Sequence, residues 1–540
     1  MSEKSVSKVI YNLIDQFNTS ENISSKEQAE KIKVNKVIGA AAYVYEKIRN
    51  AVDYNDEHLI RKNAIYRILK RKLVLEKIIL ENYLLDKYHQ DNIAEHLLQE
   101  LIRGGYVSDI PESIINEVDK IVGHYNKLIN EIKELEGRID GKIFDKILEI
   151  EAVEIERKLI PTKKEDALIK AMFSVMNARI QLSTSELSEK EKELQIFIGC
   201  HRALYKLDDG MLRHLLLNLY YPEWKSFNLN TLKQIASNAK GIFQEFEKQL
   251  NHPWKKELNK IFSKNAIIFG IIKDIIDEKG DEANEIFSNR ERLEEEIKKA
   301  CQRRYKGVGI KLRRGVIRSI IYVFFTKMLL ALAIELPLDN LLTGVVDWRT
   351  LGINIVFPPI LMLIVSMTIS LPKKENTNKI IDEIKQITFN SSTTNFFKLK
   401  MPRKRGWIMN YSFKIIYALT FVFCLALILR GLYYLNFNVV SSFIFVMFLT
   451  LVSFFGMRIR RPVKEIMTIE KRENIISIII DFISLPFISM GRWLSVKFSR
   501  INFIAFLLDF IIEAPFKLLI EIIEDLFSFL KEKKEDVMSE

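Results

Sequence analysis

Four long apolar stretches within about 140 residues of this 540-residue chain constrain its fold more than any other feature. They contain 17 to 22 residues each and are Val316–Pro337, Ile353–Leu371, Phe413–Leu429 and Val439–Met457. A helix rises about 1.5 Å per residue, so about 20 residues cross a hydrocarbon core ~30 Å thick. One such stretch is also typical of a helix buried in a soluble core. Four of them so close together predict a membrane protein with four spans.

Positively charged side chains gather on one side of these predicted spans. The basic residues near the span ends are Arg303, Arg304, Arg313 and Arg314, then Arg403, Lys404 and Arg405, then Arg458, Arg460 and Arg461. The loop after the first span instead carries Glu335, Asp339, Asp347 and a single Arg349, and the turn after the third span is uncharged. Lys and Arg near span ends remain on the cytoplasmic side. The sequence therefore predicts a multi-pass protein of the plasma or inner membrane with both termini in the cytoplasm.

The predicted fold class is all-α. Gly (20) and Pro (12) are scarce, whereas β architectures need frequent turn residues. The predicted domains are a large cytosolic helical region (1–300), a basic juxtamembrane segment (301–315), a four-helix transmembrane bundle (316–457) and C-terminal amphipathic helices (458–540). The bundle consists of two hairpins joined by a basic cytosolic loop (372–412).

The sequence predicts successive amphipathic helices throughout the first 300 residues of the chain. Capping boxes such as Thr162 with Glu165 and Ser188 with Glu191 mark helix starts. The predicted helices are near 26–50, 57–89, 111–136, 142–159, 165–182, 188–206, 230–250 and 281–304. An aromatic segment, 207–228, has two interpretations: a pocket for a partner, or more commonly a core corner where a helix stops before Pro222.

The C-terminal region, 474–531, is apolar but is interrupted by Pro486 and Pro515. Its uninterrupted intervals are too short to span a bilayer comfortably, so they predict interfacial or re-entrant helices. Between them lie residues with the character of lipid-headgroup anchors: Arg492, Trp493, Lys497 and Arg500. Together with the basic span ends they predict contact with anionic headgroups. Nucleic acid is not an expected partner, because aromatic residues do not interleave with these basic clusters.

Polar residues within the first two spans form a candidate intramembrane site of Lys327, Glu335, Asn354, Pro358 and Pro359. Ionisable residues inside a span are costly and often functional. The adjacent prolines leave the carbonyls of Asn354 and Ile355 without intrahelical donors, so an ion or substrate site is one interpretation. The alternative is structural, with the Lys327 side chain extending back toward the basic side of the membrane.

Enzyme and metal motifs are not found in the sequence. HExxH, GxGxxG and GxSxG are missing, and the histidine pair nearest to metal spacing, His89 and His96, has no converging third ligand. The sequence therefore predicts no catalytic residue, no metal and no cofactor. A membrane-bound enzyme lacking these signatures remains a third functional class.

Two functional hypotheses follow from the sequence. The first is a membrane-anchored helical scaffold or adaptor, which binds an unidentified protein partner or another copy of itself. It is motivated by the size of the helical region relative to spans with few polar groups. The second is a small-solute or ion transporter or channel that uses the polar residues of the first two spans.

Overall fold

The computed structural model describes most of the chain in nine continuous stretches. These are residues 7–23, 57–82, 93–108, 110–182, 188–337, 348–389, 396–399, 406–469 and 475–500, with Ile32, Tyr43, Glu46 and Leu341 between them. Side chains are not described in 20–23, 74–82, 410, 475–481 and 496–500. The described residues are mostly helical, as predicted, and form two compact units.

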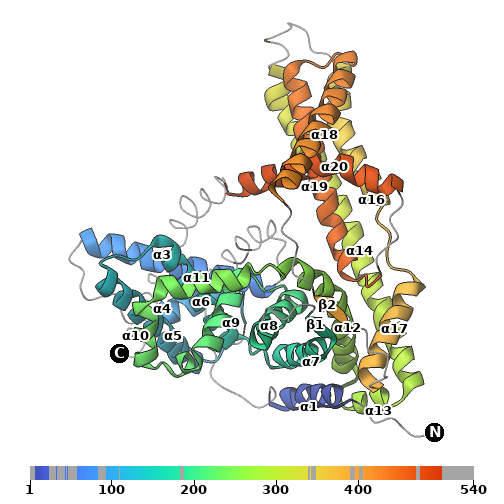
Figure 1. Cartoon of the computed structure of the whole chain (residues 1–540). Coiled ribbons are helices and arrows are strands. Elements are labelled where there is room, and N and C mark those ends of the chain that lie inside the picture. The colour runs from blue at the N-terminus through green and yellow to red at the C-terminus, as the bar shows by residue number, and fades with distance from the viewer. Residues whose placement is uncertain are drawn as a thin grey trace, which may run out of the picture. The chain divides into compact units, whose positions relative to one another are not determined.

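The N-terminal unit contains the described residues of Lys8–Phe262 and Asn395–Met401. Its helices, drawn from blue to green in Figure 1, are α1 (Lys8–Ile23), α3 (Glu57–Asn82), α4 (Ile93–Arg103), α5 (Ser113–Glu136), α6 (Gly141–Leu159), α7 (Lys163–Arg179), α8 (Glu189–Tyr205), α9 (Asp209–Tyr220), η1 (Pro222–Ser226), α10 (Leu229–Ser237) and α11 (Ala239–Leu250). Two short strands, β1 (Ile180–Leu182) and β2 (Phe397–Leu399), pair in parallel with Ile180 opposite Phe397.

One apolar core in this unit is formed by helices α3, α4, α5 and α6 together with α9, α10 and α11. Trp224 of η1 is fully buried in it and packs on the rings of His124 and Tyr125, with ring centroids 4.2 and 5.2 Å away. The helix α9 ends at Tyr220, just before Pro222. The part of the aromatic segment around Trp224 is therefore a core corner, which is the more common of its two interpretations.

The structure also corrects several predicted helix boundaries. The helix expected at 230–250 is divided into α10 and α11 at Asn238, and the one expected at 165–182 ends at Arg179, where β1 follows. Ser188 caps α8 as predicted, because its hydroxyl accepts from the Glu191 amide at 3.2 Å. The helix α1 was not predicted, and the helix expected at 26–50 lies outside the described residues except for Ile32, Tyr43 and Glu46.

The second unit, which holds the four helices long and apolar enough to cross a membrane, contains Ser7 and the described residues of Ser263–Thr394 and Pro402–Asp509. The division between the units falls inside α12 (Lys255–Lys279). The elements that follow are η2 (Gly280–Glu282), α13 (Ala283–Ser288), α14 (Arg290–Leu330), the π-helical turn η3 (Ala331–Glu335), α16 (Trp348–Met367), α17 (Lys374–Phe389), α18 (Trp407–Tyr434), α19 (Val439–Glu465) and α20 (Ile475–Arg500).

Four helices of the described chain are long and apolar enough to cross a membrane: Arg290–Glu335, α16, α18 and α19. They coincide with the four predicted spans. The predicted domain boundaries at 300 and 315 both fall within α14, because this helix runs without a break from the basic segment into the first span. The predicted loop 372–412 contains a helix, α17, as well as β2.

Contacts between these helices show which of their ends lie together. At the basic end, Arg460 of α19 donates to the hydroxyl of Thr368, just beyond α16, at 2.5 Å, and Gly309 of α14 lies close to Leu371. At the other end, the Thr350 hydroxyl of α16 donates to the carbonyl of Leu435 at 3.5 Å. The basic flanks of the first, second and fourth helices therefore lie at the same end of the bundle.

A buried asparagine holds the basic end together. The side-chain amide of Asn376 in α17 donates to the hydroxyl of Tyr305 at 2.8 Å and to the carbonyl of Ile466 at 3.0 Å. Its oxygen accepts from the backbone amide and the hydroxyl of Thr468, at 2.8 and 2.9 Å. One side chain thus joins α14, α17 and the segment that follows α19, and the sequence gives no local signal for it.

We expect Asn376→Ala to lower the free energy of unfolding by about 2–4 kcal/mol, because each lost buried hydrogen bond contributes about 1 kcal/mol. The matched control is Asn378→Ala, an exposed asparagine on the same helix, which should change it by less than about 0.5 kcal/mol. Thermal unfolding of the full chain in detergent measures both. Equal effects of the two substitutions contradict the role assigned to Asn376.

Candidate functional site

The structure brings three of the five predicted intramembrane site residues into contact. The Lys327 ammonium of α14 pairs with the carboxylate of Glu335, and both side chains have 0% exposure. The Glu335 carboxylate also accepts a hydrogen bond from the side-chain amide of Asn354 in α16, at 2.9 Å. Protein side chains alone close the pair off from solvent.

The π-helical turn Ala331–Glu335 explains how two residues eight positions apart meet. A regular α-helix turns about 100° per residue, which places residue i+8 about 80° around the axis from residue i. A π turn closes each hydrogen-bonded ring with one more residue and so turns less per residue. The turn therefore brings Glu335 back toward the side of the helix that carries Lys327.

The remaining contacts of the site come from α16 and α19. Asn354 also donates to the carbonyl of Ser441 at 3.4 Å, and the Lys327 ammonium lies 5.0 Å from the centre of the Phe448 ring. A cation at this distance over a ring face is attracted to it. Apolar side chains of the same three helices form the adjoining core: Val323, Met362, Ile444, Phe448 and Val452. The site consequently joins α14, α16 and α19.

The two prolines lie further along α16, about one helical turn beyond Asn354. Both are inside the helix, and Pro358 is buried whereas Pro359 is half-buried. The helix continues through them to Met367. Their effect is to leave the carbonyls of Asn354 and Ile355 without the usual amide donors.

The structural interpretation of the sequence had the Lys327 side chain extending back toward the basic end of the span, and this detail is wrong. The side chain reaches the other way, to Glu335, which lies closer to the opposite end. Glu335, counted in the sequence with the acidic loop, is a buried member of the helix end. Pairing with a fully buried carboxylate is the physical reason, because a lone ammonium in an apolar interior is far costlier.

The predicted headgroup residues have varied surroundings. Arg303 and Arg304 already pair with carboxylates of α12, those of Glu278 and Asp274. Arg313, Arg314, Arg458, Arg461 and Arg492 are exposed, and so is Trp493 (58%). The structure does not describe the side chains of the remaining predicted headgroup residues Arg403, Lys404, Arg405, Lys497 and Arg500.

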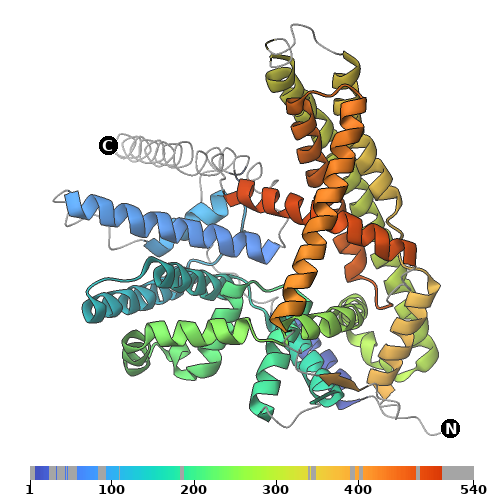
Figure 2. The ribbon, with the colours of Figure 1, turned by 45° about the horizontal axis from the view of Figure 1, so that its top comes forward.

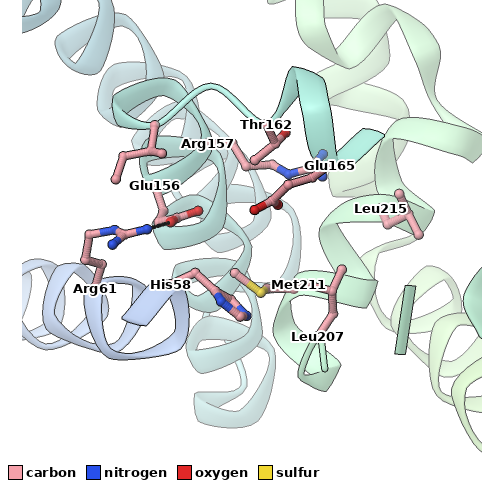
Figure 3. A pocket seen from close by; sticks show the side chains of 10 residues that line it. His58, Arg61, Glu156, Arg157, Thr162, Glu165, Leu207, Met211 and Leu215 are labelled. Carbon is pink, nitrogen blue, oxygen red and sulfur yellow. Dashed lines mark hydrogen bonds and ion pairs between the residues drawn. The ribbon is translucent and has the colours of Figure 1, made fainter. Parts of the chain in front are cut away.

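A small pocket lies in the N-terminal unit between α3, α6, α7 and α9 (Figure 3). Its volume is about 40 Å³, which suits a few water molecules rather than a metabolite. Arg61 pairs with Glu156 across it at 3.0 Å, and Arg157 and Glu165 also line it. Two cations and two carboxylates balance each other, so the pocket offers no net charge to an ionic ligand.

A second set of polar contacts in this unit centres on the half-buried carboxylate of Glu154. This carboxylate accepts from the hydroxyl of Tyr125 at 2.6 Å and from the indole of Trp224 at 3.2 Å, and the His214 ring lies 3.9 Å away. Burial lowers the pKa of His214 to about 3, which leaves the ring neutral and poorly suited to act as a base near pH 7. These groups stabilise the core corner around Trp224.

Glu151, one turn before Glu154, is fully buried, and among the described residues neither of its oxygens has a hydrogen-bond partner. Burial raises its pKa well above the usual value, and the neighbouring Glu154 charge adds to this effect. A buried carboxyl without partners is costly to ionise.

The described residues contain no group of three or more His, Cys, Asp or Glu side chains placed to hold a metal ion. The chain matches no family model, no curated protein and no solved structure at a significant level. The class defined by the structure is therefore a mostly helical protein with four helices able to span a membrane.

We expect Lys327→Met and Glu335→Gln, made singly, each to lower the free energy of unfolding by about 3–5 kcal/mol, because each leaves an unpaired buried charge. The double substitution removes both charges and should destabilise the protein less than either single change. Thermal unfolding of the four proteins in detergent gives this double-mutant cycle. Additive losses would show that the two groups do not interact.

We expect Glu151→Gln to stabilise the protein increasingly as the pH rises above about 4.5, the usual carboxyl pKa. The folded pKa is raised, so the contribution of Glu151 to stability is complete below about pH 4.5 and is lost as pH rises toward the folded pKa. Melting temperatures between pH 4 and 8 measure the difference. The matched control is Glu134→Gln, an exposed carboxyl on α5, which should show little dependence on pH.

Proposed function

We propose that this protein is a membrane-anchored helical scaffold. Its four spans fix the chain in the bilayer, and its N-terminal unit contacts a protein partner or another copy of the chain. The observation that favours this function over transport is the complete burial of Lys327 against Glu335. The Lys327 ammonium, the Glu335 carboxylate and the Asn354 amide nitrogen contact one another, as expected of a structural contact between helices.

A transport path needs polar groups that exchange partners with a solute or with water. Here the ammonium and the carboxylate neutralise each other, and Asn354 supplies a further hydrogen bond. Apolar side chains close the adjoining space. This arrangement supports a closed bundle whose polar contact fixes the register of α14 against α16 and α19.

The N-terminal unit supports the scaffold proposal because it has its own core and retains exposed apolar side chains. At the C-terminal end of α9, Leu219 is 50% exposed and Tyr220 is 44% exposed. Large apolar side chains that remain exposed together at one end of a helix are typical of protein contacts. We therefore choose them as the first positions to vary.

The bilayer is the second partner in this proposal. Exposed arginines at the basic end of the bundle, Arg313 and Arg314 of α14 and Arg458 and Arg461 of α19, would meet anionic headgroups. Under the rule that basic flanks stay inside, this end faces the cytoplasm of a plasma or inner membrane, and both termini lie there.

A small-solute or ion transporter is the second candidate, and one observation favours it. The side-chain oxygen of Asn354 is buried and has no hydrogen-bond partner among the described residues. It lies on the residue that binds Glu335, beside a π-helical turn, and π turns occur often at functional sites. An alternative arrangement of the Lys327–Glu335 pair would give this oxygen a ligand.

The scaffold proposal predicts that chemical cross-linking in native membranes captures the full chain with a stable partner, either itself or another protein. Leu219→Ser/Tyr220→Ser should reduce this capture several-fold because it removes exposed apolar contact area. The control is Leu135→Ser, which changes an equally exposed apolar residue at the far end of α5. Recovery of an uncross-linked monomer from native membranes contradicts the scaffold.

Flux through liposomes separates the two candidates. The scaffold predicts that reconstituted protein conducts no small ion or solute above the level of empty liposomes. A specific flux that Lys327→Met/Glu335→Gln abolishes, in protein that still inserts and melts normally, would make the transporter the correct function.

A further inference from the structure

The last described helix, α20, lies across the spanning bundle and not along it. Figures 1 and 2 show it, in red, crossing α18 and α19. The Tyr417 hydroxyl of α18 donates to the hydroxyl of Ser489 at 3.1 Å, and the rings of Phe421 and Phe487 lie 5.6 Å apart. A helix of 26 residues, about 39 Å long, is thus held by its middle.

Gly491 fixes the crossing point on α19. A Cβ atom at this position would lie 2.0 Å from the carbonyl oxygen of Thr450 and 2.9 Å from the Cβ of Phe454. The first neighbour is backbone, so it cannot move aside without shifting the helix. Only glycine allows α20 to approach this closely.

The depth of the crossing can be measured along two helices independently. On α18, Lys414 is the exposed cation nearest to the basic end among the described residues, and Tyr417 and Phe421 lie about 5 and 10 Å of helix rise from it. On α19, Phe454 and Thr450 lie about 6 and 12 Å from Arg458. Both helices therefore place α20 about 5–12 Å inside the basic end of the bundle.

This range overlaps the depth of helices that lie in the plane of a membrane, about 5–10 Å into the boundary between headgroups and acyl chains. The side chains of α20 that the bundle leaves uncovered suit that layer. Phe482, Ile483 and Leu485 are each more than two-fifths exposed, and Arg492 and Trp493 have the character of interfacial anchors. Pro486 and Phe487 are buried.

We infer that α20 is an in-plane wedge whose partner is the lipid leaflet at the basic end of the bundle. The inference rests on the proposed membrane location of α18 and α19. The wedge increases the cross-sectional area that the protein occupies in the leaflet at the basic end. Among the described helices, none lies in the same way at the opposite end of the bundle. The protein should therefore prefer membranes in which the basic-side leaflet is convex.

Spin labels in reconstituted full-length protein test the depth. The background is cysteine-free, with Cys200, Cys301 and Cys424 replaced by alanine. Single labels then replace Leu485 in α20, Val422 in the middle of α18, and Lys464 beyond the basic end. Accessibility to oxygen and to a water-soluble nickel chelate should place the Leu485 label between the other two.

Each alternative result has its own meaning. A Leu485 label as deep as the Val422 label overturns the wedge in favour of a re-entrant or spanning helix. A Leu485 label as water-exposed as the Lys464 label removes α20 from the membrane. A Val422 label that is itself water-exposed contradicts the membrane proposal, not merely the wedge.

The density of protein on small and large vesicles tests the curvature preference. An impermeant dye on Lys464→Cys marks the molecules whose basic end faces outward. Their density per membrane area should be higher on small vesicles, and Gly491→Leu should abolish this excess by displacing α20. The control is Gly431→Leu in α18, where an added side chain meets open space, and it should keep the excess. Equal densities of wild-type protein on both vesicle sizes contradict the preference.

Discussion

The Lys327–Glu335 pair imposes the strictest physical requirement on this structure. Two opposite charges with no exposure to solvent are tolerated in an apolar bundle only when they face each other and their remaining hydrogen-bonding capacity is met. The π-helical turn directs Glu335 to the side of the helix that carries Lys327. The side-chain amide of Asn354 donates a hydrogen bond to one oxygen of the Glu335 carboxylate. The positions of α14, α16 and α19 are thus coupled at a single point near one end of the bundle.

The opposite end is organised by different contacts. Asn376 joins α14, α17 and the chain beyond α19 through hydrogen bonds, and Gly491 allows α20 to lie directly on the backbone of α19. Exposed arginines surround this end. The bundle therefore has one end closed by a buried ion pair and another that offers cations and an apolar crossing helix to its surroundings. This asymmetry is the physical basis for proposing an anchor that senses one leaflet.

Much of the fold could be predicted from the sequence because span length and hydropathy are local properties. The helix α16 was located despite two internal prolines, and a core corner before Pro222 was the more common of the two interpretations of segment 207–228. Contacts that depend on distant parts of the chain could not be predicted. Asn376 meets residues about 90 positions away, and nothing in its neighbourhood in the sequence indicates this.

The candidate site shows the same division. Its residues were identified because ionisable and amide groups are conspicuous in an apolar stretch. The geometry of these residues could not be predicted, because the sequence does not reveal the π turn. In the structural interpretation of the sequence, Lys327 pointed toward the basic end, whereas it pairs with Glu335 toward the opposite end. Nor did the sequence indicate the contribution of Ser441 and Phe448, since a serine and a phenylalanine are ordinary in a span.

The labelling of single cysteines by an impermeant thiol reagent from each side of a sealed membrane tests most directly whether the four helices cross the bilayer. Lys373 and Lys464 mark the basic end, and Trp348 and Tyr434 mark the other end. The account predicts that the first two positions react only from one side and the last two only from the opposite side. Reaction of all four positions from the same side would contradict it.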